Sequence, residues 1–214
     1  MLYALIENKS AIALLDYHLK PYKFGTFQIF YMNKKLGLIH RTIIDSVKWI
    51  LKKAYNSNKT GKNRCPILIN ENDICCLMFK NLYNPPKYLV RSEYSNSILK
   101  QRSDLVIFDS KRTSYKLNKN RNPYLFKSDK YLATLEFKLI WFQSKNRLLK
   151  KIIPENLKAL LKFKKKNWSE LIYLIIFDYK GLLNKDDVQK LKKSKYRSIC
   201  IIYADIKNNK LLVK

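Results

Sequence analysis

The sequence predicts an α/β protein in which helices flank a central mixed β-sheet. Two observations predict this class. Short apolar runs rich in β-branched and aromatic residues are typical of buried strands, and between them lie segments whose apolar residues recur at helical spacing. Over residues 65–205 the predicted order is a helix, two or three strands, and then helix, strand, helix and strand.

The first part of the chain contains one clear helix, followed by a polar linker. Residues 2–19 are read as a helix that ends before Pro21, and residues 24–32 as a loosely alternating strand. The clear helix covers 38–55. Its apolar stripe consists of Ile39, Ile43, Val47, Ile50 and Leu51.

The polar linker at residues 56–63 predicts a domain boundary. We expect residues 1–60 to form an N-terminal extension of helical or mixed structure, a candidate dimerisation or DNA-binding element. Residues 61–214 would form the main domain.

The main domain is expected to begin with a capped helix. Asn70 can cap it, and Glu71 and Asp73 lie in its first turn, where the helix dipole favours acidic side chains. Its buried face would hold Ile74, Leu77, Met78 and Leu82, and the helix would stop at residues 84–86, Asn-Pro-Pro. Strands are then expected at 88–94, 102–109, 133–141, 171–177 and 198–204, with helices starting at Pro154 and covering 184–193.

The charge balance points to a polyanionic partner. The chain has 44 Lys and Arg against 16 Asp and Glu, which gives a net charge of +28. Nucleic acid is the leading candidate for such an excess. The alternative is a lysine surplus that follows from an AT-rich genome, because Asn, Ile and Tyr are also abundant.

The cysteines and the apolar runs indicate a reducing, cytoplasmic environment. Cys65, Cys75, Cys76 and Cys200 form no Cys-x-x-Cys pair, so we expect free thiols rather than a zinc site. No apolar run approaches the roughly 18 residues of a membrane span. Glu7 and Lys9 interrupt the apolar start, so we expect no signal peptide.

Two predicted strands carry charged residues that need an explanation. Asp104 opens the run 102–109, and Glu136 and Lys138 lie in the middle of the run 133–141. Because side chains alternate along a strand, Glu136 and Lys138 point to the same face. Unpaired buried charge is very costly, and two carboxylates can share a divalent cation. Alternatively, Asp104 closes a turn and Glu136 forms an ion pair on an exposed strand.

This arrangement resembles the PD-(D/E)XK nuclease superfamily, which has the restriction-endonuclease-like fold. The resemblance rests on Asp104 in Arg-Ser-Asp-Leu-Val-Ile-Phe and on residues 136–138, Glu-Phe-Lys, on the next core strand, and it covers about residues 65–205. Ser103 stands where the motif has Pro. The gap between Asp104 and Glu136 is longer than in compact members, which makes residues 110–130 an insertion.

The resemblance implies a metal-dependent DNA endonuclease. Asp104, Glu136 and the Phe137 carbonyl would bind Mg²⁺ or Mn²⁺, and Lys138 would orient the attacking water or stabilise the phosphate. The products would carry a 5′-phosphate and a 3′-hydroxyl. A homodimer would suit cutting of both strands. The alternatives are a non-catalytic nucleic-acid-binding protein on the same fold and an RNA endonuclease.

Additional residues are candidates for the same site. The superfamily often adds a Glu on the helix before the sheet, and Glu71 fits this place, with Asp73 as its alternative. Glu93, near a strand end, would reach the metals, and Gln143 would contact the scissile phosphate or a ligand water.

Two clusters of cations are candidates for nucleic-acid binding. The insertion mixes cations with Tyr115 and Tyr124, a composition that suits a loop following a strand of nucleic acid, with its tip near residues 116–121. Its candidates are Lys111, Arg112, Lys116, Lys119 and Arg121. The second cluster, at a helix C-terminus, is Lys162, Lys164, Lys165 and Lys166. The alternatives are a solvated insertion and stabilisation of the helix end.

Overall fold

The computed structural model describes most of the chain from residue 34 onward. The described residues are 34–59, 66–83, 88–96, 101–112, 114–116, 125–127, 130–191 and 196–214. The helix and strand expected within residues 1–33, together with Lys119, Arg121 and Tyr124, lie outside this part of the chain.

The helices and strands follow the predicted order. The helical segments are α2 (Lys34–Lys59), α3 (Glu71–Leu82), the 3-10 turn η2 (Ser110–Arg112), α4 (Lys145–Arg147), the π-helical turn η3 (Leu148–Ile152), α5 (Ile153–Lys165) and α6 (Lys185–Leu191). The strands are β1 (Tyr88–Asn96), β2 (Gln101–Asp109), β3 (Ser114–Lys116), β4 (Leu125–Lys127), β5 (Tyr131–Ile140), β6 (Ser169–Asp178), β7 (Cys200–Asp205) and β8 (Lys210–Val213). None of the described helices combines the length and the apolar composition needed to cross a bilayer.

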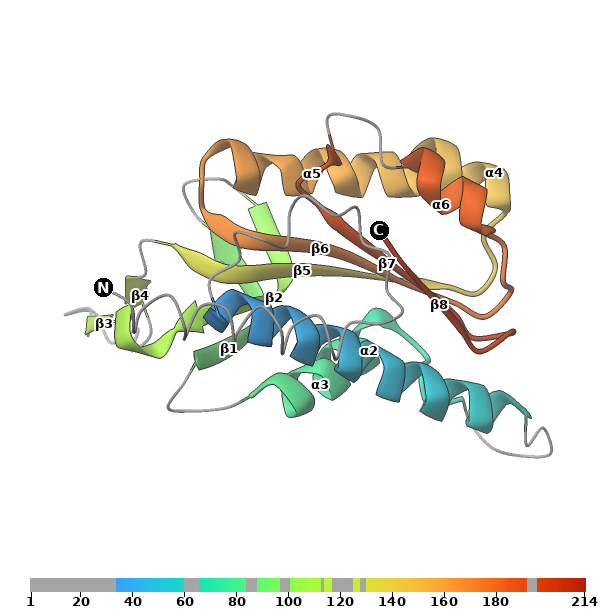
Figure 1. Ribbon diagram of the computed structural model, residues 1–214, viewed down its shortest axis with the longest axis horizontal. Coiled ribbons are helices and arrows are strands. Elements are labelled where there is room, and N and C mark those ends of the chain that lie inside the picture. Colours follow the sequence, from blue (N-terminus) through green and yellow to red (C-terminus); the bar gives the residue numbers. More distant parts are fainter. Residues whose placement is uncertain are drawn as a thin grey trace, which may run out of the picture. The chain divides into compact units, whose positions relative to one another are not determined.

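A six-stranded sheet forms the centre, and it is mixed, as the sequence predicts. Its strand order is β1-β2-β5-β6-β7-β8. The pairs β1–β2, β2–β5 and β7–β8 are antiparallel, whereas β5–β6 and β6–β7 are parallel. Figure 1 shows α4, α5 and α6 on one side of this sheet and α2 and α3 on the other. The α/β class with a mixed sheet between helices is therefore confirmed.

Helix α2 belongs to the same compact unit as the central sheet. The predicted stripe of Ile39, Ile43, Val47, Ile50 and Leu51 is fully buried. Lys35 Nζ lies 2.7 Å from Asp109 Oδ2, and a 2.7 Å hydrogen bond joins His40 Nδ1 to the Tyr173 hydroxyl. The compact unit extends from Lys34 to Lys214, so it begins before the boundary expected near residue 60.

Local sequence explains the start of α3. Asn70 Oδ1 accepts a hydrogen bond from the Asp73 N–H at 3.1 Å, and Asp73 Oδ2 accepts from the Asn70 N–H at 2.9 Å. This reciprocal capping satisfies two amides that the helix cannot pair, and such caps contribute about 1 kcal/mol. Glu71 is thereby fixed as the first helical residue.

Two features of the sheet differ from the prediction. Strand β2 begins at Gln101, so Asp104 lies within the strand and does not open it. The polar residues before Asp104 belong to strand β2 because β1 supplies hydrogen-bond partners for their backbone groups. Strand β8 was not expected; it pairs with β7 after a turn in which Asn209 has a φ of 49°.

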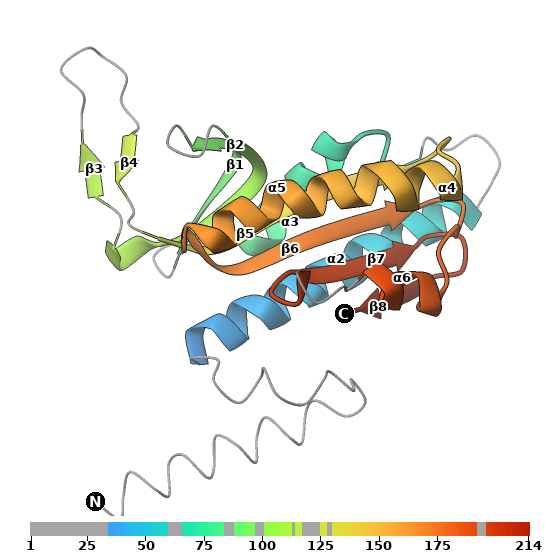
Figure 2. The ribbon, with the colours of Figure 1, turned by 90° about the horizontal axis from the view of Figure 1, so that it is seen from above.

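The insertion at 110–130 contains a small separate hairpin. It holds η2 and the antiparallel pair β3–β4. The chain leaves β2 after Asp109 and enters β5 at Tyr131, so the insertion joins the sheet at the end where β5 begins (Figure 2).

Candidate active site

The predicted acidic residues meet where β2 and β5 stop pairing. The ladder between these strands covers Leu105–Phe108 and reaches Leu135 on β5. Continuing its register places Asp104 opposite Glu136, and directly opposed residues in an antiparallel pair share a face. Both side chains are mostly buried.

The Asp104 side chain bonds a β5 amide beyond the point where the β2–β5 ladder ends. Its Oδ2 accepts a 2.7 Å hydrogen bond from the Phe137 N–H. The N–H and C=O groups of a strand residue point to the same neighbour. The Phe137 carbonyl therefore faces the same edge as Asp104, which is the position that the predicted third ligand requires.

Lys138 links the strand to helix α3. Its Nζ lies 3.1 Å from Glu136 Oε1 and 3.1 Å from Glu71 Oε2. Glu71 Oε1 also accepts from the Leu139 N–H at 3.4 Å. The structure thus brings Glu71 to the Glu-x-Lys strand, while the alternative Asp73 is occupied in the helix cap.

The site carries more acid than its single ammonium group balances. Burial, followed by the charge of Asp104, raises the pKa of Glu136 to about 7, although Lys138 opposes this. Burial also raises the pKa of Asp104, against the Phe137 hydrogen bond. Burial disfavours the charge on Lys138, but the carboxylates of Glu136 and Glu71 outweigh it and raise the pKa of Lys138. Three carboxylates around one ammonium form a site that favours an additional cation.

The donors that fit the predicted metal site are two carboxylates together with a backbone carbonyl. Among the described residues, no three His, Cys, Asp or Glu side chains are grouped to hold a metal ion by themselves. Asp104, Glu136 and the Phe137 carbonyl are oxygen donors at one strand edge, and hard divalent cations prefer such ligands, with water completing the shell. These residues therefore fit Mg²⁺ or Mn²⁺.

The remaining acidic and amide candidates lie at the margins of the site. Glu93 is opposite Asp104 on β1, has a φ of 50° and forms an ion pair with Arg102. Gln143 lies in the turn after β5, and its Oε1 accepts from the N–H groups of Trp141 at 3.0 Å and Phe142 at 3.2 Å. The oxygen of Gln143 is therefore engaged in shaping this turn.

The described side chains of the predicted cation clusters, those of Lys111 and the α5 lysines, lie at the other end of the sheet. Lys162, Lys164, Lys165 and Lys166 are exposed at the end of α5. The neighbouring Phe163 and Trp168 contact the ring of Tyr131, the first residue of β5. Lys111, in the insertion, is exposed as well. Tyr131 precedes Glu136 by five residues, or about 17 Å of strand.

The structure therefore does not bring these cations to the acids. The side chains of Arg112 and Lys116 are outside the described part, as are Lys119 and Arg121 as a whole.

Sequence reasoning missed two neighbours of the site. The Cys75 thiol donates to the Asp104 carbonyl at 3.7 Å, and burial with the nearby acids raises the pKa of Cys75 to about 12, so it packs as a neutral thiol. A depression of about 380 Å³ is lined by Ile69, Asn70, Glu71, Asn72, Leu139 and Trp141. The sequence feature that could have indicated this depression is the aromatic pair Trp141–Phe142 directly after the Glu-x-Lys strand.

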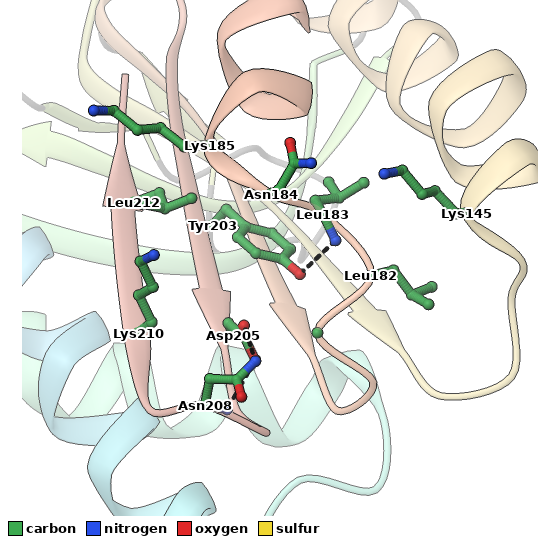
Figure 3. Close-up of a pocket in the computed structure, with 11 residues that line it drawn as sticks. Lys145, Leu182, Leu183, Asn184, Lys185, Tyr203, Asp205, Asn208, Lys210 and Leu212 are labelled. Atoms are coloured by element: carbon green, nitrogen blue, oxygen red, sulfur yellow. Dashed lines mark hydrogen bonds between the residues drawn. The ribbon is translucent and has the colours of Figure 1, made fainter.

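A second cavity, of about 300 Å³, lies beside Tyr203 (Figure 3). The Tyr203 hydroxyl donates to Asp178 Oδ2 at 2.6 Å and accepts from the Leu183 N–H at 3.0 Å. Asn208 Nδ2 donates to Asp205 Oδ2 at 2.7 Å. Because these polar groups satisfy one another, we assign them to stabilising the loops around β6 and β7.

In comparisons with protein families, with curated proteins and with solved structures, nothing matches this chain.

Proposed function

We propose that this chain is a metal-dependent endonuclease of the PD-(D/E)XK type that hydrolyses phosphodiester bonds in DNA. The observation that carries the proposal is the meeting of Asp104, Glu136 and Lys138 with Glu71 at one strand edge. These residues come from three separate elements, β2, β5 and α3. The mixed sheet between helices is compatible with a restriction-endonuclease-like core.

Each residue has a role that follows from its position. Asp104 and Glu136 would hold Mg²⁺ or Mn²⁺ together with the Phe137 carbonyl. When bound, the metal lowers the pKa of its water and polarises the phosphate. Lys138, held by Glu136 and Glu71, presents an ammonium group beside the same edge and would stabilise negative charge that develops on the phosphate. Glu71, whose side chain is 42% exposed, can accept a proton from a water in the depression.

DNA is the proposed substrate because of the charge of the whole chain. A net charge of +28 favours a polyanion, and binding should then weaken steeply with salt. A salt dependence close to zero would assign the lysine surplus to genome composition instead.

One observation favours a second candidate, a nucleic-acid-binding protein without catalysis. Glu136 and Glu71 are both paired with Lys138, so the cluster holds together as an ion-pair network. The difference between the two candidates is whether the site performs hydrolysis when a divalent metal is supplied.

The test is cleavage of plasmid DNA, single-stranded DNA and RNA with Mg²⁺, with Mn²⁺ and with EDTA. We expect Mg²⁺-dependent nicking of DNA that EDTA abolishes. Binding without cleavage under all these conditions would favour the second candidate, and cleavage of RNA alone would change the substrate class.

A further inference from the structure

A series of three aromatic rings leads from the core to solvent next to the active site. The rings of Tyr179 and Trp141 are stacked with centroids 3.9 Å apart, and the rings of Trp141 and Phe142 are stacked at 6.2 Å. Tyr179 is buried, and its hydroxyl donates to the Leu68 carbonyl at 3.2 Å. Phe142, at the outer end, is 87% exposed.

The turn that exposes Phe142 is fixed by hydrogen bonds. Gln143 Oε1 accepts from the N–H groups of Trp141 and Phe142. Ser144 then caps the following helix by accepting from the Arg147 N–H at 3.3 Å. The ordered turn thus keeps the Phe142 side chain exposed to water. Within this chain, the ring gains no free energy of burial.

The middle ring, Trp141, adjoins Glu71 of the proposed active site. Trp141 lines the same depression as Glu71, and Leu139, on the strand that carries Lys138, lines it as well. Ile69, which also lines the depression, is 61% exposed. Trp141 and Ile69 therefore share one depression with a carboxylate of the proposed active site, and Phe142 stacks on Trp141 outside it.

We infer that Trp141, Phe142 and Ile69 form a base-binding platform that takes an unpaired nucleobase next to the phosphate to be cut. Aromatic side chains bind single strands because every base has a face on which to stack, whereas in a duplex the neighbouring base pairs cover these faces. Arg147, which is exposed five residues after Phe142, offers a cation for the backbone of the same strand.

The inference rests on the proposed function and narrows its substrate to single-stranded or locally unpaired DNA. For a base to stack on the platform while a neighbouring phosphate is contacted, the sugar–phosphate backbone of the DNA strand must pass the depression with its bases turned toward the protein. A nucleobase is thus the occupant whose chemistry matches an apolar surface that is surrounded by polar and charged groups.

The test compares binding of a labelled single strand and of the blunt duplex of the same sequence, in Ca²⁺ so that no cleavage intervenes. Phe142→Ala should weaken single-strand binding by about 5- to 150-fold, the range for losing one base–aromatic stack, and change duplex binding by less than about twofold. Phe142→Tyr keeps a ring and should restore single-strand binding.

Tyr83→Ala is the matched control. Tyr83 is an aromatic residue of 49% exposure, but it follows the C-terminus of α3, whereas Glu71 begins that helix. The two positions are separated by about 18 Å of helix. This variant should leave both affinities unchanged.

The outcomes separate the inference from the proposed function. Equal weakening on both substrates, or no weakening, overturns the platform even when wild-type protein cleaves DNA. Selective loss of single-strand binding by Phe142→Ala supports the platform even when no cleavage is found in Mg²⁺, and in that case the nuclease proposal alone fails. Absence of DNA binding by the wild-type protein overturns both.

Discussion

The two ends of the central sheet differ in the kind of side chain that they present. Toward the end where β5 finishes, three carboxylates, Lys138 and the exposed ring of Phe142 lie near the edge beyond β2. At the end where β5 begins, Lys111 and the lysines at the C-terminus of α5 are exposed to solvent. The first end has the groups for chemistry on a phosphate, and the second has groups suited to electrostatic attraction of a polyanion.

Under the proposed function, this difference would separate the groups for catalysis from the groups for DNA affinity. Tyr131, at the start of β5, and Glu136 are about 17 Å apart along the strand, which corresponds to about five nucleotides at 3.4 Å per nucleotide of one strand. A DNA strand of that length is long enough to contact both regions. Mutations at one end should then alter the cleavage step, and mutations at the other end should alter mainly binding.

The largest effect is expected from Glu136→Gln. Removing one carboxylate of the proposed metal site should lower cleavage by about 10³-fold or more, because a preorganised electrostatic group acts directly on the reaction. DNA binding should persist or tighten, since a negative charge near phosphates is lost. Rates are measured on plasmid DNA in Mg²⁺.

Glu170→Gln is its control at the opposite end. Glu170 pairs with Lys130 at 2.7 Å, near the start of β6. The same chemical change there should leave cleavage within about twofold of wild type, as expected of a surface ion pair. Cleavage by Glu136→Gln at the wild-type rate would remove the site assignment.

The second prediction concerns stability as a function of pH without metal. The pKa of Glu136 rises from 4.5 to about 7 in the folded state, so between these values the folded protein binds more protons than the unfolded chain. Stability from this group is therefore greatest at acidic pH and falls as pH rises to about 7. The full difference is at most about 3 kcal/mol.

Melting temperatures of wild type and Glu136→Gln across this pH range measure the effect. The wild type should lose stability relative to the variant as pH rises, and saturating Mg²⁺ should reverse the trend, because the metal binds the ionised carboxylate. Parallel curves for the two proteins would show that Glu136 ionises in the fold as it does in the unfolded chain.

A smaller effect is expected from replacing Lys164, Lys165 and Lys166 with Gln. Each of these lysines that contacts a phosphate should contribute about 0.9 to the salt slope of log K. Binding should weaken about tenfold at low salt, with the cleavage rate at saturating DNA unchanged. An unaltered salt slope would restrict these residues to stabilising the end of α5.

The smallest effect is expected at the insertion. Replacing Lys116, Lys119 and Arg121 with Ser should weaken DNA binding by a few fold without lowering the melting temperature, because loop insertions contribute little to stability. Cleavage of limiting DNA should fall in proportion. Unchanged binding would mean that the insertion does not contact the substrate.

Local patterns in the sequence were sufficient to predict the core of the site. Asp104 and Glu136 stood out because apolar strand residues flank them, and strand alternation placed Glu136 and Lys138 together. Asn70 and Asp73 predicted the helix start that fixes Glu71. Each of these predictions depends on residues within a few positions of one another.

Features that depend on distant partners were not predictable in the same way. Gln101 is polar and precedes the expected strand 102–109, and it belongs to β2 because Asn96 of β1 pairs with it. Strand β8 similarly depends on β7. The position of the lysines relative to the acids depends on the direction of β5 in the sheet, and net charge contains no information about that direction.

Trp141 and Phe142 show a further limit. Directly after an apolar strand, two aromatic residues look like its continuation, and the expected strand included Trp141. The strand ends at Ile140, and Gln143 Oε1 accepts hydrogen bonds from the N–H groups of the two preceding residues, Trp141 and Phe142. A side-chain hydrogen bond therefore decided whether the second ring is buried or exposed.

The irregular outer strands of the sheet have a consequence for self-association. β1 contains Glu93 with a positive φ, and β8 has only four residues, beginning with Lys210. A distorted strand and a short, charged strand both oppose the addition of further strands. We therefore expect concentrated protein to resist fibril-like aggregation, and a dimer of this chain would have to associate through surfaces other than a continuous intermolecular sheet.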